Sequence, residues 1–326
     1  MDVAVTRIEL PRPVRAAASD GSTVWCAADD GVRAYTPSGR LLERGEAVRR
    51  SPAAGGGAVP RSTAAGGQAV SRSPAAGGEA VPELHSLAAV PGTVAGTGAV
   101  PGTLAETVLV PRAFAGPPAS GPLPDGTLAG ASRDHVHWLG PSGTVIADAP
   151  FTGRVVAGGG AIWAVGDGVA RRLAGPGTLG EPLKLPALDA CAVEGERLWW
   201  TSQRDDVLRG GPKEVRLGRR SRGAMTVCAG SLWISVTGGL LRVSAWSGEP
   251  GRFVRAPEGP VRFLVCANGV LLGGGRDVFA PARAAGAALR VIELGLDAPP
   301  ALMIAAGRHV WVFPEGAPAA LIVTPG

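Results

Sequence analysis

The chain repeats a short apolar segment that ends on Trp or Leu and follows a polar or Gly-containing turn. Six copies are clear, and they begin at Ser22, Ala161, Arg197, Ser231, Gly269 and His309. From the second copy onward, successive copies begin 34 to 40 residues apart. That period is typical of the four-stranded blade of a β-propeller.

The interval between the first two copies is too long for one blade and contains a further unit. Residues 125–134 (DGTLAGASRD) match residues 268–277 (NGVLLGGGRD) in pattern. This hidden unit raises the number of repeats to seven. We therefore predict an all-β fold, a seven-bladed β-propeller.

Each unit continues with a turn rich in Asp and Gly, a third strand, a second turn such as Pro-Ser-Gly, and a fourth strand. The last unit lacks a fourth strand, because the sequence stops soon after the strand at residues 320–324. Residues 5–10 form an alternating strand with no local partner. We predict that this N-terminal strand completes the last blade and closes the ring.

The most regular copy carries a family resemblance. Residues 230–236 (GSLWISV), followed by 241–243 (LRV) and 247–249 (SGE), resemble the repeat of bacterial propellers of the virginiamycin B lyase, NHL and quinoprotein-like superfamily. The resemblance extends over all seven units and implies the fold. It implies no single activity, because such folds host unrelated functions.

One segment breaks the repeat. Residues 47–108 are rich in Ala, Gly and Pro and contain an 11-residue tandem repeat that begins at Arg50, Arg61 and Arg72. We predict a disordered insertion there, between blades one and two of a propeller formed by residues 1–46 and 109–326. Either it is a tolerated surface loop or it is a partner-binding arm, and removal of residues 50–105 is expected to matter little.

Composition narrows the function classes. The net charge is +5, and all of the 32 Lys and Arg residues except Lys184 and Lys213 are arginine, scattered among acids. This pattern suggests a bacterial source with a GC-rich genome and argues against a nucleic-acid partner. The sequence shows no leader and no membrane span, so we expect a cytoplasmic protein with four reduced cysteines and no membrane partner.

Acidic residues recur at the turn between the second and third strands of the units. They are Asp30, Asp167, Asp206, Asp277 and Glu315. All such turns face the same side of a propeller, so these acids are predicted to form a sparse ring around the channel mouth, as a surface for a partner or a cation. The alternative is that Asp simply favours turns.

Two further groups of residues are candidate ligands. His135 and His137 share one face of a predicted strand and are weak ligand candidates, against an alternative as solvated positions. Cys191, Cys228 and Cys266 end the first strands of three successive units, where they either bind a soft metal or serve as compact apolar residues. Without a third histidine or a CxxC spacing, we predict no metal, no cofactor and no catalytic residues.

These observations favour a non-catalytic protein-interaction scaffold with a protein partner. Cytosolic bacterial propellers of this kind resemble those encoded beside MoxR-type ATPases and von Willebrand A-domain proteins, which implies membership of such a multi-protein system. The alternative is a propeller enzyme, such as a lyase or hydrolase, that acts at the channel mouth. Convergence of His135, His137, Asp206 and Asp277 in one pocket would favour the enzyme.

Overall fold

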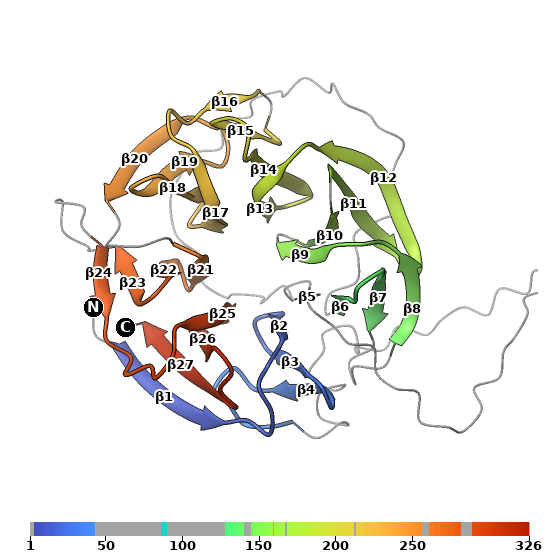
Figure 1. Cartoon of the computed structure of the whole chain (residues 1–326), viewed down its shortest axis with the longest axis vertical. Helices are drawn as coiled ribbons and strands as arrows, with labels where there is room; N and C mark the ends of the chain where they lie inside the picture. Colours follow the sequence, from blue (N-terminus) through green and yellow to red (C-terminus); the bar gives the residue numbers. More distant parts are fainter. Residues whose placement is uncertain are drawn as a thin grey trace, which may run out of the picture.

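The computed structural model describes residues 3–42, 86–89, 128–139, 145–158, 160–166, 168–211, 213–255, 261–281 and 289–325. Their strands form seven antiparallel sheets, arranged as blades around a central axis (Figure 1). No α-helix occurs in this part of the chain. It therefore contains no helix that is long and apolar enough to cross a membrane. The predicted seven-bladed β-propeller is confirmed.

The first four blades follow each other along the chain. Blade one holds β2 (Ala16–Ser19), β3 (Val24–Ala28) and β4 (Gly31–Tyr35). Blade two holds β5 (Ser86–Ala89), β6 (Leu128–Ala131), β7 (His135–Leu139) and β8 (Val145–Pro150). Blade three holds β9 (Arg154–Gly158), β10 (Ala161–Gly166), β11 (Gly168–Gly175) and β12 (Thr178–Leu185). Blade four holds β13 (Leu188–Glu194), β14 (Arg197–Ser202), β15 (Val207–Arg209) and β16 (Val215–Arg216).

The remaining three blades complete the ring. Blade five holds β17 (Ser221–Cys228), β18 (Ser231–Val236), β19 (Gly239–Ser244) and β20 (Pro250–Arg255). Blade six holds β21 (Phe263–Ala267), β22 (Val270–Gly274), β23 (Val278–Pro281) and β24 (Leu289–Ile292). Blade seven holds β25 (Pro300–Ala306), β26 (His309–Pro314), β27 (Ala319–Pro325) and β1 (Val3–Glu9).

The repeated Trp of the second strand packs between blades. Trp25, Trp199 and Trp311 are at most 1% exposed. Trp199 belongs to an apolar cluster that joins residues of blades four and five, including Leu208 and Leu232. An aromatic side chain in this position buries a large apolar area, so the pattern that marks each blade in the sequence also holds neighbouring blades together.

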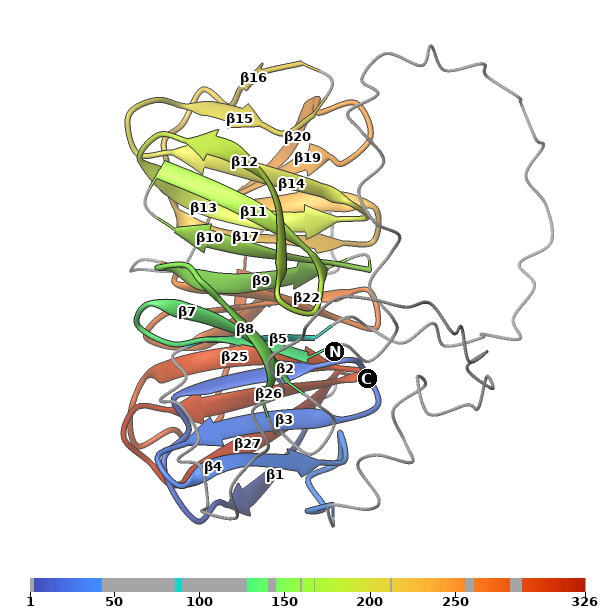
Figure 2. The ribbon, with the colours of Figure 1, turned by 90° about the vertical axis from the view of Figure 1, so that its right-hand side faces the viewer.

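The ring closes in blade seven, as predicted. β1 pairs antiparallel with β27 from Val3 opposite Pro325 to Glu9 opposite Ala319, and Figure 2 shows the two strands side by side at the edge of the disc. Chain segments from opposite ends of the sequence therefore share one sheet, and β27 is left with no open edge.

Blade one differs from the prediction at its outer edge. The expected fourth strand at residues 40–43 is reduced to a single bridge between Tyr35 and Leu41, with Glu43 outside the described residues. The turn before it packs closely on blade seven: a Cβ at Gly39 would lie 2.7 Å from Ile322 and 2.9 Å from Ile8. Because Gly39 also has φ of +99°, a side chain there would be both strained and crowded.

The inner strand of blade two lies inside the range predicted for the insertion. β5 pairs with β6 from Ser86 opposite Ala131 to Ala89 opposite Leu128, and Leu87 is 8% exposed. Removal of residues 50–105 would delete this strand, so that removal is no longer expected to be harmless. The rest of the range 47–108 lies outside the described residues, and its disorder stays a prediction.

A disulfide corrects the expectation of four reduced thiols. Cys228 at the end of β17 is bonded to Cys266 in β21, with Cα atoms 5.3 Å apart, while Cys26 and Cys191 are free. The two bonded residues occupy equivalent positions in the inner strands of adjacent blades. Equivalent positions in adjacent repeats are neighbours in space, which brings the two sulfur atoms together.

A candidate site at the mouth of the central channel

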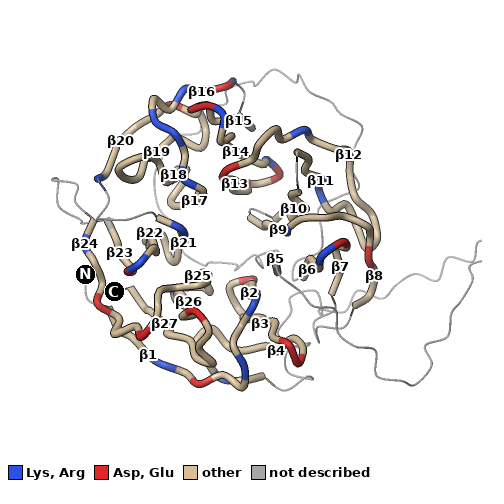
Figure 3. Tube along the Cα trace, viewed as in Figure 1, with Lys and Arg blue, Asp and Glu red and all other residues tan. Residues whose placement is uncertain are grey.

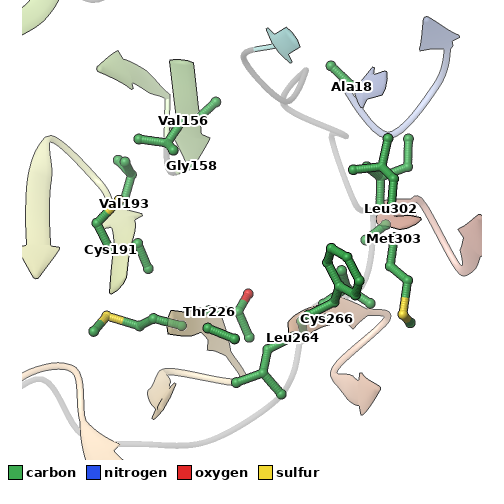
Figure 4. A pocket seen from close by; sticks show the side chains of 18 of the residues that line it. Ala18, Val156, Gly158, Cys191, Val193, Thr226, Leu264, Cys266, Leu302 and Met303 are labelled. Atoms are coloured by element: carbon green, nitrogen blue, oxygen red, sulfur yellow. The ribbon is translucent and has the colours of Figure 1, made fainter. Parts of the chain in front are cut away.

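The inner strands of the seven blades surround a cavity of about 720 Å³, here called the channel. Residues of β2, β5, β9, β13, β17, β21 and β25 line it. Figure 4 shows Val156, Cys191, Thr226, Leu264 and Leu302 arranged around its open centre. Most of the lining side chains are apolar, so the channel offers a ligand an apolar wall with few polar groups.

The two ends of the channel differ in charge. Strands alternate in direction within each blade, so every inner strand begins on the face that carries the turns between second and third strands, here called the turn face. Arg15, Arg154 and Arg262 line the channel and precede or begin their inner strands, which places them at this face. Glu194, the last residue of β13, lines the opposite end.

The three arginines differ in their partners. Arg15 forms an ion pair with Asp29 in the turn between β3 and β4, and Arg154 Nη2 lies 3.8 Å from Cys191 Sγ. Within the described residues, the Arg262 guanidinium has no ion-pair or hydrogen-bond partner. All three side chains are exposed, so they present positive charge to solvent at the mouth of an apolar cavity.

The thiol beside Arg154 is not activated. Burial raises the pKa of Cys191, and the positive charge and hydrogen bond of Arg154 oppose this only in part. Because a thiolate is the reactive form of cysteine, a raised pKa keeps Cys191 in its unreactive protonated form at neutral pH.

The predicted acids lie in the expected turns but not at the channel edge. Asp30, Asp206, Asp277 and Glu315 each lie between the second and third strands of their blades, while Asp167 lies outside the described residues. These turns are one or two strands further from the axis than the inner strands that carry the arginines (Figures 1 and 3). The use of these acids as a contact surface stays a prediction.

One of these acids has a firm local partner. Asp30 accepts two hydrogen bonds from Arg33, at 2.8 and 2.7 Å, and this guanidinium lowers the pKa of the Asp30 carboxyl. In blade four Arg209 donates hydrogen bonds to Asp205 and Glu214, and none to Asp206.

The histidine pair lies in blade two, away from the channel. His135 and His137 share one face of β7, with ring centroids 6.1 Å apart. His135 Nδ1 lies 2.9 Å from Asp134, whose hydrogen bond raises the pKa of His135. His137 is 8% exposed with Nε2 2.8 Å from Ser132 Oγ, and burial lowers its pKa.

These histidines do not meet the acids that would have indicated an enzyme. Asp206 follows β14 in blade four and Asp277 follows β22 in blade six, whereas β7 belongs to blade two (Figure 1). Across the described residues, no group of three or more His, Cys, Asp or Glu side chains is placed to hold a metal ion. The convergence on one pocket that would have favoured an enzyme is therefore not found among the described residues.

Sequence reasoning missed the arginines at the channel. A usable pattern was present, because Arg15, Arg154 and Arg262 each stand directly before an apolar inner strand in their repeats. This pattern lies at the start of the first strand, whereas the predicted acids lie in the turns between the second and third strands. The arginines are scattered along the sequence, and only the ring of blades brings three of them to one opening.

Solved structures agree with the fold. A catalytically inactive virginiamycin B lyase from Staphylococcus aureus with quinupristin has 12% identity and a TM-score of 0.62, with all of both chains covered. The WD40 β-propeller domain of Doa1 has 13% identity and a TM-score of 0.59, over 99% of this chain and 96% of that one. The chain shares a fold with both. No family model and no curated protein matches the sequence.

A third solved structure with a similar fold belongs to a protein assembly. A chain from a mitotic checkpoint complex has 10% identity and a TM-score of 0.61, over 98% of this chain and 91% of that one. At such identities these likenesses establish the propeller and leave the activity open.

Proposed function

We propose that this protein is a non-catalytic interaction scaffold that binds a protein partner through the turn face. The observation that carries the proposal is that separate blades contribute exposed charged residues to this one face. Arg154 and Arg262 stand at the channel mouth, while Asp30, Asp277 and Glu315 stand in the turns further out. Charges of both signs in fixed positions favour one partner and one orientation.

The fold neighbours support an interaction role in general terms. A propeller in a mitotic checkpoint complex works within an assembly, as its description says, and propellers present rigid faces on which loops can vary. We further propose that the partner belongs to a bacterial cytosolic multi-protein system, of the kind that contains MoxR-type ATPases and von Willebrand A-domain proteins. This finer assignment rests on the resemblance of the repeat.

The low-complexity segment fits the same proposal. The chain leaves the edge of blade one after Leu42 and returns at Ser86, at the start of the inner strand of blade two. A connection between these positions starts and ends at the turn face. We propose that residues 43–85 act as an arm beside the surface that the partner uses.

The test compares charge reversals on the two faces of the disc. In the first variant Asp277 and Glu315 are replaced by Arg, so that this variant and its control each reverse two charges. The matched control carries Glu196→Arg and Glu249→Arg in turns of the opposite face. Each protein is tagged, expressed in its native host and purified, and the partners that co-purify in stoichiometric amounts are quantified by mass spectrometry.

The proposal expects stoichiometric partners with the native protein and the control, and their loss with the turn-face variant. Equal recovery with both variants would show that the turn face is not the contact surface. Absence of any stoichiometric partner from the native protein would contradict the scaffold role itself. Circular dichroism and the Tm of each variant establish that the fold is intact.

A further inference from the structure

We propose that the channel binds a small amphipathic anion, with its charged head group at the arginines of the turn face and its apolar body inside the channel. This ligand site goes beyond the scaffold role and does not depend on it. It rests on three features of the described residues: the size and lining of the cavity, the position of the arginines, and the contrast between the two channel ends.

The cavity has the properties of a small-molecule site. Its volume of about 720 Å³ lies within the range of roughly 300–1,000 Å³ that is usual for ligand pockets. Val156, Leu264, Leu302 and Ile304 contribute apolar side chains from three different inner strands, and Thr226 adds a hydroxyl. Burial of an apolar ligand against such a wall is favourable by the hydrophobic effect.

The positions of two arginines follow from strand geometry. Side chains alternate along a strand, so Arg154 shares the side of β9 that Val156 presents, and Arg262 shares the side that Leu264 and Cys266 present. Those neighbours line the channel, and Figure 4 labels Val156, Leu264 and Cys266 around it. The two guanidinium groups therefore stand at the rim directly above the apolar wall.

The charge at this rim favours an anion. In the described part of the chain, Arg262 has no ion-pair or hydrogen-bond partner, and Arg154 has one long contact, 3.8 Å, to the Cys191 sulfur. Guanidinium groups bind carboxylate, sulfonate and phosphate oxygens through paired N–H donors. Arg222, the second residue of β17, starts its inner strand on the same face and adds to the positive field.

The opposite end of the channel determines the orientation of the ligand. Glu194 lines that end, where its Oε2 accepts a hydrogen bond of 3.2 Å from Trp199 Nε1. A carboxylate there repels a second negative group. A ligand with one anionic head and one apolar end places its negative charge beside the arginines and none beside Glu194. A dianion with a charge at each end would place one of them beside Glu194.

Two fluorescent probes of nearly the same shape test the proposal. The probe 8-anilinonaphthalene-1-sulfonate is an anion, and N-phenyl-1-naphthylamine is its uncharged parent. Both fluoresce in apolar surroundings, so each is titrated into the folded protein. We expect binding at one site per chain for both probes, and roughly tenfold tighter binding of the anion, as a charge-assisted hydrogen bond provides.

Variants assign the site. Arg154→Gln and Arg262→Gln are each expected to weaken binding of the anionic probe by about threefold, so that together they account for the roughly tenfold preference, while the uncharged probe binds as before. Val156→Trp fills the channel and is expected to abolish the binding of both. The matched control is Arg290→Gln, which removes an exposed arginine from the outer strand β24 and is expected to change neither probe.

Several results would overturn the proposal. These are equal affinity for the two probes in the native protein, loss of both probes with the arginine variants, and persistence of both with Val156→Trp. Binding at many sites, or no binding to a protein with a normal Tm, would do the same. Because no partner protein is present, failure here leaves the scaffold proposal standing, and failure of the scaffold leaves this site standing.

Discussion

Blades seven and one are neighbours in the ring, but they are completed in different ways. Blade seven has four strands, and its outermost strand β1 pairs with β27 along seven residues of each strand. Blade one has three strands within the described residues, and there its edge continues beyond Tyr35 only as the bridge to Leu41. Their inner strands β2 and β25 lie side by side, so the two edges can be compared in one surrounding.

Blade one, which has fewer strands, is stabilised in part by contacts with blade seven. Trp311 of blade seven donates a hydrogen bond of 2.8 Å from Nε1 to the Pro37 carbonyl of blade one, and its ring lies 5.7 Å from that of Tyr35. The turn at Gly39 rests on Ile8 and Ile322. Blade seven thus supplies packing that a fourth strand of blade one would otherwise provide.

The largest expected effect comes from breaking the complete blade. A variant without residues 3–9 loses the whole β1–β27 ladder and leaves β27 paired only with β26, so at about 1 kcal/mol for each net hydrogen bond it should lose several kcal/mol of unfolding free energy. The denaturant midpoint measures this loss. A variant without residues 46–80, which spares β5, should keep the native midpoint. An unchanged midpoint after removal of residues 3–9 would mean that ring closure is not needed.

A smaller effect tests the narrow blade. Leu42 is 5% exposed and packs with Trp25, Leu87 and Leu128 between blades one and two. Leu42→Ala should cost about 2–3 kcal/mol of unfolding free energy, as other buried Leu→Ala changes do. Its neighbour Leu41 is 54% exposed, so Leu41→Ala should change stability by no more than about 0.5 kcal/mol. Equal costs would show that the edge of blade one is not ordered by this contact.

The smallest effect concerns pH. His309 Nδ1 lies 2.7 Å from Thr324 Oγ1 across β26 and β27, and burial, with a smaller contribution from Arg308, lowers the pKa of His309. The unfolded chain therefore takes up a proton more readily, so this contribution to stability is present above about pH 6.5 and is lost as the pH falls below it.

This pH effect is measured as the change in Tm between about pH 7.5 and about pH 5. Because His135 and His137 also titrate, the quantity of interest is the difference between native protein and His309→Gln. The Tm of the native protein should fall further than the Tm of the variant, and the difference should be no more than a few degrees. Identical shifts would show that His309 does not contribute to the pH response.

The architecture was predictable because its main signals are local. The Trp-bearing second strand and its flanking turns recur in most blades, and the unpaired alternating strand at residues 5–10 indicated closure. β5 was missed because Ser86-Leu87-Ala88-Ala89 is short, has no aromatic residue and lies in a sequence of the same Ala-rich composition. Its strand conformation depends on β6, and such tertiary support leaves no local pattern.

The site was less predictable because it depends on neighbours in the ring. Arg15, Arg154 and Arg262 are far apart in sequence and differ little from the many other arginines. Only the parallel arrangement of inner strands brings them to one opening. The Cys228–Cys266 disulfide has the same origin, although the equivalent positions of these residues in adjacent units were visible in the sequence.

The pairing of β1 with β27 also sets the order of events during synthesis. Residues 3–9 leave the ribosome about three hundred residues before their partners at 319–325. At roughly 5–20 residues per second, this takes tens of seconds. During that time the first strand has no native partner, and the ring cannot close until the seventh blade is complete. The nascent protein therefore carries an open sheet-forming segment throughout this interval, a period in which a chaperone that binds extended chains would have the greatest effect on yield.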